Sequence, residues 1–172
     1  SSEAGSNGAS RAGGRSAEQI RLDGIDDQYR QIRANLSTEI SQGLAEVERD
    51  GDLIIIRLAE RGSFASGLAL LQPSFERLLD NVGASLVGTT GLIQIEGHTD
   101  NVPLAFGSRY RDNWDLSSAR SASVADYLLG EEYVPPGNMV VMGLADTQPI
   151  ASNDSALGRA SNRRIEIVVK GD

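Results

Sequence analysis

The chain has 172 residues and carries 16 Lys and Arg against 24 Asp and Glu, a net charge of −8. This length suits one domain of ordinary size plus an appendage, and 40% hydrophobic residues are enough for a buried core. Such an acidic chain is a poor binder of nucleic acid, which requires a basic surface. The absence of Cys and the single His exclude thiol catalysis, disulfides and multi-histidine zinc sites. No apolar run approaches the length of a membrane-spanning helix.

The chain opens with two segments of different character. Residues 1–15 are almost all small or polar, which predicts a flexible linker. Residues 16–50 carry apolar side chains three or four positions apart, which predicts an N-terminal amphipathic helix. The apolar stripe consists of Ile25, Tyr29, Ile32, Leu36, Ile40, Leu44 and Val47. Such a stripe packs on the core of the domain, or it also pairs with a second copy of the chain, as in a short coiled coil.

Residues 51–172 are predicted to form a single domain. Asp50-Gly51 predicts a turn, and the β-branched or apolar runs at 53–58, 92–96, 139–142 and 164–169 predict strands. Helices are expected at 73–86 and 116–129, and glycine-rich or polar loops at 61–67, 97–115 and 143–162. This order of elements predicts the α+β class, as an α/β sandwich with helices packed on a mixed sheet of about four strands.

Signals for enzyme chemistry are weak. The chain has no G-x-S-x-G, Walker or G-x-G-x-x-G segment. Glu96, His98 and Asp100 alternate from the end of a predicted strand and could hold a metal or act in hydrolysis. A His98 that hydrogen-bonds the backbone and fixes the loop explains the pattern better. We therefore expect no catalytic residue, no metal and no cofactor.

Two opposite charges bracket the irregular loop at 97–115. Asp100 follows a predicted strand, and Arg120 lies near the start of a predicted helix. The planar guanidinium of Arg binds a carboxylate through two parallel hydrogen bonds, and an Asp can accept from an ammonium. If the fold brings the two ends together, the pair suits a zwitterionic ligand with an ammonium and a carboxylate on one carbon. Alternatively, Asp100 and Arg120 pair with each other or with neighbouring side chains.

Three segments resemble the signature segments of the OmpA-like peptidoglycan-binding domain. They are Gly-His-Thr-Asp-Asn at 97–101, Asn-Trp-Asp-Leu-Ser-Ser-Ala-Arg at 113–120 and Asn-Arg-Arg-Ile-Glu-Ile at 162–167. The resemblance covers the chain from about Leu53 to Val169. Within it, Arg-Gly-Ser-Phe-Ala-Ser-Gly at 61–67, Asn-Val-Pro at 101–103 and Asn-Trp-Asp-Leu-Ser at 113–117 resemble the flagellar motor stator B subunits of the MotB and PomB family.

The resemblance implies a binding role for particular residues. Members of the family bind the diaminopimelate residue of peptidoglycan stem peptides without catalysing a reaction. By this resemblance Asp100 would hold the ammonium and Arg120 the carboxylate. Other residues would line the pocket or close it from the last loop. These are Thr99, Asn101 and Leu116 as lining residues, and Asn162 with Arg163 or Arg164 as the closing residues.

The resemblance also implies a place in the cell. A stator B subunit has this domain in the periplasm, tethered to the inner membrane by a single N-terminal helix that this sequence does not contain. Its partners would be peptidoglycan, a second copy in a homodimer, the stator A subunit and flagellar basal-body components. Two alternatives stay open. One is the wall anchor of another envelope protein, such as an OmpA- or Pal-type lipoprotein or a secretion system. The other is a cell-wall hydrolase that uses Glu96, His98 and Asp100.

Overall fold

The computed structural model describes residues 14–171, so the predicted linker at 1–15 lies mostly outside the described part. The elements are α1 (Ala17–Asn35), α2 (Ser37–Ser41), β1 (Ala45–Asp50), β2 (Leu53–Ala59), α3 (Pro73–Leu86), β3 (Ile93–His98), α4 (Asn113–Gly130), the 3₁₀ turn η1 (Pro136–Asn138), β4 (Met139–Gly143), α5 (Ala156–Asn162) and β5 (Arg164–Lys170). Among residues 14–171, none of the helices combines the length and the apolar content needed to cross a membrane.

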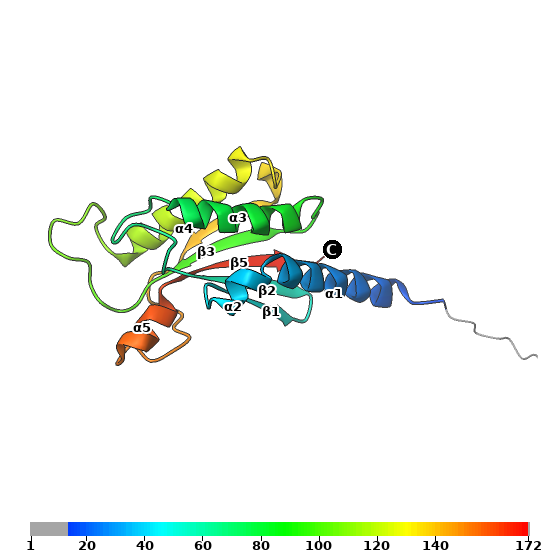
Figure 1. Ribbon diagram of the computed structural model, residues 1–172, viewed down its shortest axis with the longest axis horizontal. Helices are drawn as coiled ribbons and strands as arrows, with labels where there is room; N and C mark the ends of the chain where they lie inside the picture. Colours follow the sequence, from blue (N-terminus) through cyan, green and yellow to red (C-terminus); the bar gives the residue numbers. More distant parts are fainter. Residues whose placement is uncertain (1–13, 172) are drawn as a thin grey trace, which may run out of the picture.

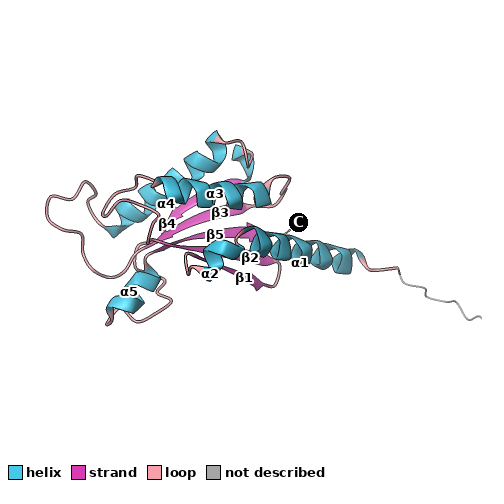
Figure 2. Ribbon diagram, in the orientation of Figure 1, coloured by secondary structure: helices cyan, strands magenta, loops and turns pink. Residues whose placement is uncertain are grey.

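The strands form one mixed sheet, which confirms the predicted α+β class (Figures 1 and 2). Its strand order is β1-β2-β5-β3-β4, with β3 and β4 parallel and the other neighbours antiparallel. The last strand of the chain, β5, therefore lies in the middle of the sheet. It pairs with β2 on one side and with β3 on the other.

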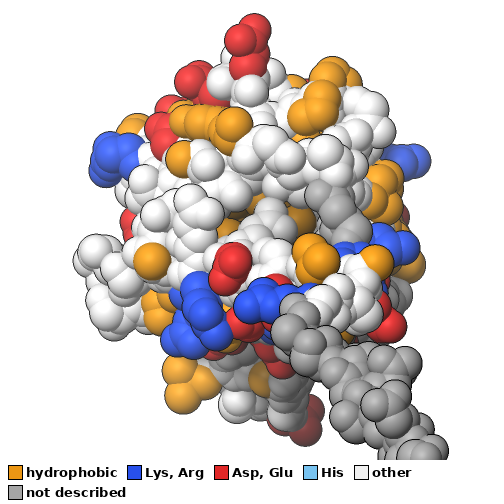
Figure 3. Space-filling view, turned by 90° about the vertical axis from the view of Figure 1, so that its right-hand side faces the viewer, with side chains coloured by type: hydrophobic (Ala, Val, Ile, Leu, Met, Phe, Trp, Pro, Cys, Tyr) orange, Lys and Arg blue, Asp and Glu red, His pale blue; other side chains and the backbone are white. Residues whose placement is uncertain are grey.

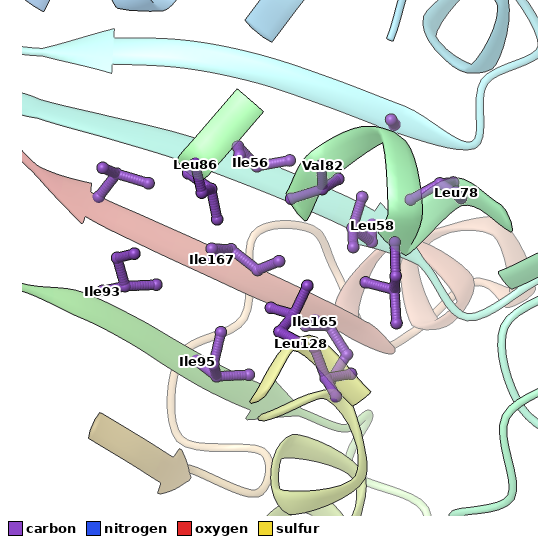
Figure 4. Packing of buried hydrophobic residues seen from close by; sticks show 14 of the residues in the cluster. Ile56, Leu58, Leu78, Val82, Leu86, Ile93, Ile95, Leu128, Ile165 and Ile167 are labelled. Atoms are coloured by element: carbon purple, nitrogen blue, oxygen red, sulfur yellow. The ribbon is translucent and has the colours of Figure 1, made fainter. Parts of the chain in front are cut away.

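One face of the sheet carries the core. The inward side chains of β2, β3 and β5 are aliphatic, and α1, α3 and α4 cover them with their own buried residues. Figure 4 shows Leu78, Val82 and Leu86 of α3 and Leu128 of α4 facing isoleucines of the sheet. Each such side chain contributes about 1.5–3 kcal/mol when it leaves water. The core is almost entirely aliphatic, and Phe64 and Phe75 are the only buried Phe, Tyr or Trp side chains in residues 14–171.

The opposite face of the sheet carries charged side chains in place of a second helical layer. Arg57 lies within 4 Å of carboxylates of Glu46, Glu48 and Glu166 there. Ion pairs also cover the end of the molecule where α1 begins. Figure 3 shows basic and acidic side chains intermingled at this end, in agreement with the pair between Arg21 and Asp52. The negative net charge is thus distributed over the surface and partly offset by local pairs.

The predicted helix over 16–50 is wrong in its last part, and it is interrupted after Asn35. The helix α1 ends at Asn35, α2 adds five residues, and residues 45–50 form the strand β1. Gly43, at φ +72°, lies between α2 and β1, where a residue with a side chain would be strained. β1 alternates buried Ala45 and half-buried Val47 with exposed glutamates, a period of two. A turn at Gly51-Asp52 joins it to β2 as a hairpin, so the sheet has five strands instead of about four.

The apolar stripe packs on the core of the same chain. Ile25, Ile32 and Leu36 are 3%, 0% and 0% exposed and belong to the core cluster. Tyr29, Ile40, Leu44 and Val47 are half-buried against it. The predicted packing of the stripe on the domain core is therefore confirmed. Helix α1 is part of the domain, and it contacts α3 and β1.

Candidate functional site

The three signature segments meet at one end of the sheet. Ala59 of β2, Arg164 of β5 and His98 of β3 lie side by side across neighbouring strands. The residues just beyond them, Glu60, Arg163 and Asp100, are therefore brought together (Figure 1). At this end the backbone of Glu60 donates a hydrogen bond to the carbonyl of Arg163 at 3.2 Å.

Helix α4 is held close to the same end by small residues. A Cβ on Gly97 would lie 2.2 Å from the carbonyl oxygen of Ser117, so only glycine permits this approach. The Ser117 hydroxyl also accepts from the backbone of Ala145, beside β4. The helix begins at Asn113, three residues earlier than predicted, and its N-cap Asp112 accepts from the backbone of Asp115 at 2.9 Å.

Asp100 is buried and has partners for both carboxylate oxygens. Its Oδ1 accepts from the backbone of Val102 at 2.9 Å, and its Oδ2 accepts from a guanidinium nitrogen of Arg163 at 2.7 Å. The side chain of Asn113 donates to the carbonyls of Val102 at 3.1 Å and of Asp100 at 3.4 Å. The loop after β3 is thereby fixed to the first turn of α4.

Arg120 is also buried, and it holds the loop that follows β2. Its Nε donates to the carbonyl of Leu68 at 2.9 Å, and its guanidinium carbon lies 4.8 Å from the ring centroid of Phe64. A terminal nitrogen lies 3.5 Å from Oε2 of Glu60. Burial lowers the pKa of Arg120 from its ordinary value, and the nearby Glu60 carboxylate opposes that change. The guanidinium keeps its charge at neutral pH.

Asp100 and Arg120 are joined indirectly, through Arg163 and Glu60. Arg163 lies 2.7 Å from Asp100 and 2.9 Å from Glu60, and Glu60 in turn faces Arg120. Charges alternate along this series of four side chains. Asp100 and Arg120 thus pair with neighbouring side chains and not with each other. Sequence reasoning missed Glu60, although its place directly after β2 puts it beside Arg163 once the strand order is known.

Three other candidate residues lie on the loop after β3 and on α4. Thr99 is buried, and its hydroxyl donates to the carbonyl of Asp100 at 2.8 Å. Leu116 is buried on the first turn of α4. Asn101 is exposed. Of the three, only Thr99 makes a side-chain hydrogen bond to Asp100 among the described residues.

Asn162 and Arg164 are not directed at this group. Asn162 is fully buried and makes four side-chain hydrogen bonds, accepting from Ile150 and Ala151 and donating to Ala151 and Asn153. Because an amide offers two donors and two acceptor positions, no capacity is left for a ligand. Arg164 binds Glu166 at 2.5 Å and two backbone carbonyls. Both residues shape the last loop, and Arg163 alone of the three turns toward Asp100.

The possible metal group Glu96, His98 and Asp100 is not assembled. Asp100 is bound to Arg163, whereas Nε2 of His98 lies 3.1 Å from Glu96 and 3.6 Å from Glu166. The hydrogen bond from His98 lowers the pKa of Glu96 below its ordinary value. One ligand atom from each of Glu96, His98 and Glu166 lies within 4.8 Å of the others. However, the guanidinium of Arg164 is already bound to Glu166, which disfavours a cation there.

A groove of about 670 Å³ opens beside the group of four charged residues. It lies between α5, the start of β1, the end of β2 and the loop after β2. Glu60 and Arg163 line it, together with the exposed apolar side chains of Ile150 and Leu157. Asp100 and Arg120 are not among its lining residues.

Residues 63–163 match the model of the OmpA family. Motility protein B of Bacillus subtilis is 26% identical over 90% of this chain and 58% of its own length. A structure described as that of a MotB-like protein from Desulfovibrio vulgaris superposes with a TM-score of 0.83 at 28% identity, covering 90% of this chain and 99% of that one. The structure of the cell wall anchor of the type VI secretion system from Pseudomonas aeruginosa superposes with a TM-score of 0.74 at 33% identity. The match covers 84% of this chain and 99% of that one. The chain spans about 60% of the length of the first curated relatives it matches.

Proposed function

The chain belongs to the OmpA family, and from this we propose that it is a non-enzymatic peptidoglycan-binding anchor of a flagellar motor stator complex. The observation that carries the proposal is the placement of Asp100 and Arg120 at one end of the sheet, joined through only two other charged side chains. The likeness to motility protein B and to a MotB-like structure supports the stator assignment.

The proposed ligand is the zwitterionic end of diaminopimelate in the stem peptide. Its ammonium would bind the carboxylate of Asp100, and its carboxylate would bind the guanidinium of Arg120. Thr99, Asn101 and Leu116 would line the pocket, with Arg163 at its outer side. Charge-assisted hydrogen bonds contribute about 1.5–3 kcal/mol each, so one site binds with modest affinity. Many such sites on one wall, and two copies in a homodimer, would raise the overall attachment by avidity.

The proposal includes a location and partners for the whole protein. The domain would act in the periplasm, tethered to the inner membrane, with the stator A subunit and basal-body components as protein partners. A second candidate is the wall anchor of another envelope complex, which the likeness to the type VI secretion anchor supports. In both cases the ligand is peptidoglycan and the chain catalyses no reaction.

Sedimentation with purified peptidoglycan sacculi tests the proposal. We expect the wild-type chain to pellet with sacculi, and Asp100→Asn and Arg120→Lys to lose most of this binding. Lysine retains the charge of Arg120 but lacks the planar fork for a carboxylate. Matched controls are Asp154→Asn and Arg111→Lys, both at exposed positions, which should bind like the wild type.

Two outcomes would contradict the proposal. A wild-type chain that stays in the supernatant would refute the anchor role, and wild-type binding by the Asp100 and Arg120 variants would refute the pocket. The supernatants also test the non-enzymatic assignment. Release of soluble muropeptides above a protein-free control would identify a hydrolase instead.

A further inference from the structure

The four charged side chains of the site divide into an inner and an outer pair. The inner pair is Asp100 and Arg120, whose side chains are 11% and 8% exposed. The outer pair is Glu60 and Arg163, which are 23% and 37% exposed and lie 2.9 Å apart. A ligand that arrives from solvent therefore meets the outer pair first.

The outer pair has the charges of a zwitterion, in the orientation that a bound zwitterion would need. The cation, Arg163, lies 2.7 Å from the carboxylate of Asp100. The anion, Glu60, lies 3.5 Å from the guanidinium of Arg120. The ammonium and carboxylate of a zwitterionic ligand would require these same two partners.

Glu60 lies between the open groove and Arg120. Glu60 and Arg163 both line the groove of about 670 Å³, whereas Arg120 lines a small cavity of about 10 Å³ that Glu60 shares. Glu60 thus faces open space on one side and Arg120 on the other. The Oε2 atom of Glu60 is buried and lies near two guanidinium groups.

We infer that Glu60 and Arg163 act as an internal zwitterion that occupies the ligand's place, and that ligand binding exchanges this pair for the ligand's own two charges. The inference rests on the proposed function and adds two residues that set its specificity. A ligand with both charges replaces both contacts of the outer pair. A ligand with one charge replaces only one contact of the outer pair. The other inner residue then stays paired with Glu60 or Arg163. The site thereby selects zwitterions over simple acids and simple amines.

Direct binding of three small probes tests the exchange. The probes are meso-diaminopimelate, pimelate, which has the same carbon chain without the amino groups, and 1,5-diaminopentane, which has the amines without the carboxylates. Their affinities are measured by calorimetry for the wild type and for Glu60→Gln and Arg163→Gln. Glu46→Gln is the matched control, because Glu46 lines the same groove and its side chain is exposed and pairs with Arg57, outside the group of four.

Removing the internal anion should favour binding of the ligand's carboxylate. We expect Glu60→Gln to bind diaminopimelate and pimelate about tenfold more tightly than the wild type, which corresponds to about 1.4 kcal/mol. Arg163→Gln should instead gain affinity for 1,5-diaminopentane, because the carboxylate of Asp100 is then free. Glu46→Gln should match the wild type for all three probes. Because Arg163 is a partly exposed residue, its variant tests the inference even if Glu60→Gln does not fold.

The outcomes separate this inference from the proposed function. If the wild type binds sacculi and diaminopimelate, but neither variant gains affinity over Glu46→Gln, the internal zwitterion is refuted and the anchor role stands. Weaker binding by Glu60→Gln would give Glu60 a positioning role toward Arg120 and would also refute the exchange. If the wild type and all variants bind neither sacculi nor diaminopimelate, the proposed function fails, and this inference fails with it.

Discussion

At the scale of single residues, hydrogen-bond saturation distinguishes the side chains that build the site from those available to a ligand. All four hydrogen-bonding positions of the Asn162 amide are used within the last loop. By contrast, Asp100 and Arg120 are paired with charged side chains, which a zwitterionic ligand would replace under the proposed exchange. The signature segments of the sequence therefore contain residues with a structural role, such as Asn162, together with residues proposed to bind the ligand, such as Asp100 and Arg120.

The structural role of Asn162 can be measured directly. Asn162→Ala should lower the free energy of unfolding by about 1–3 kcal/mol, because it leaves buried backbone groups of the last loop without partners. Urea unfolding followed by circular dichroism would measure the loss. Asn101→Ala, at an exposed position, should change stability by less than about 0.5 kcal/mol. Equal stability of the two variants would show that the amide of Asn162 is not needed for the loop.

Sequence reasoning named both residues of the inner pair and Arg163 of the outer pair, but it did not name Glu60. Asp100 and Arg120 lie in recognisable segments around a polar loop, so their pairing with a zwitterion could be predicted. Glu60 belongs to no such segment, and its role depends on β2 and β5 being neighbours. Strand order is set by contacts far apart in the sequence, so the local pattern around Glu60 carried no signal for it.

At the scale of elements, close contact between α4 and the sheet sets the position of the site. Gly97 and Gly143 lie on adjacent strands, and a Cβ on either would overlap the first turns of α4.

The sequence of β1 fits both a helix and a strand, which explains why the prediction of a helix there is wrong. Leu44 and Val47 extend the helical stripe by one step, but Ala45 and Val47 also fit a strand with alternating glutamates. The backbone hydrogen bonds with β2 favour the strand, with its period of two residues, over the helix, with its period of 3.6.

Substitution of Gly97 tests the close contact of α4. Gly97→Ala should destabilise the domain by about 1–3 kcal/mol, because its Cβ would lie 2.2 Å from a backbone oxygen and the helix would have to shift. The control is Gly130→Ala, at the end of the same helix, where a Cβ meets nothing within 4 Å. That control should be neutral or slightly stabilising, because Ala favours helix. Thermal unfolding of both variants compares them, and an unshifted melting temperature for Gly97→Ala would contradict the packing argument.

At the scale of the whole molecule, α1 completes the hydrophobic core. Ile32 is fully buried on α1, whereas Ile20 on the same helix is exposed. The mixed sheet and the two helices α3 and α4 could be predicted from period and turn signals alone. The docking of α1 was one interpretation of its stripe, but the sequence left open whether the helix also pairs with a partner helix.

Two isoleucines of α1 provide a matched test of its docking. Ile32→Ala should lower the free energy of unfolding by about 2–5 kcal/mol through the cavity it leaves. Ile20→Ala should lower it by less than about 0.5 kcal/mol. Denaturant unfolding monitored by circular dichroism measures both values. A small loss for Ile32→Ala would mean that α1 is only loosely attached in solution.

The placement of α1 has a mechanical consequence for an anchor. Helix α1 begins at one end of the long axis of the molecule, and the charged group lies beyond the strand ends at the other (Figure 1). Tension between these two ends would run roughly along the strands and along the axis of α1. Such tension loads the hydrogen bonds of the sheet and the docked side chains of α1 in shear, so that many contacts resist at once. A pull across the strands would instead open them one after another, at a lower force.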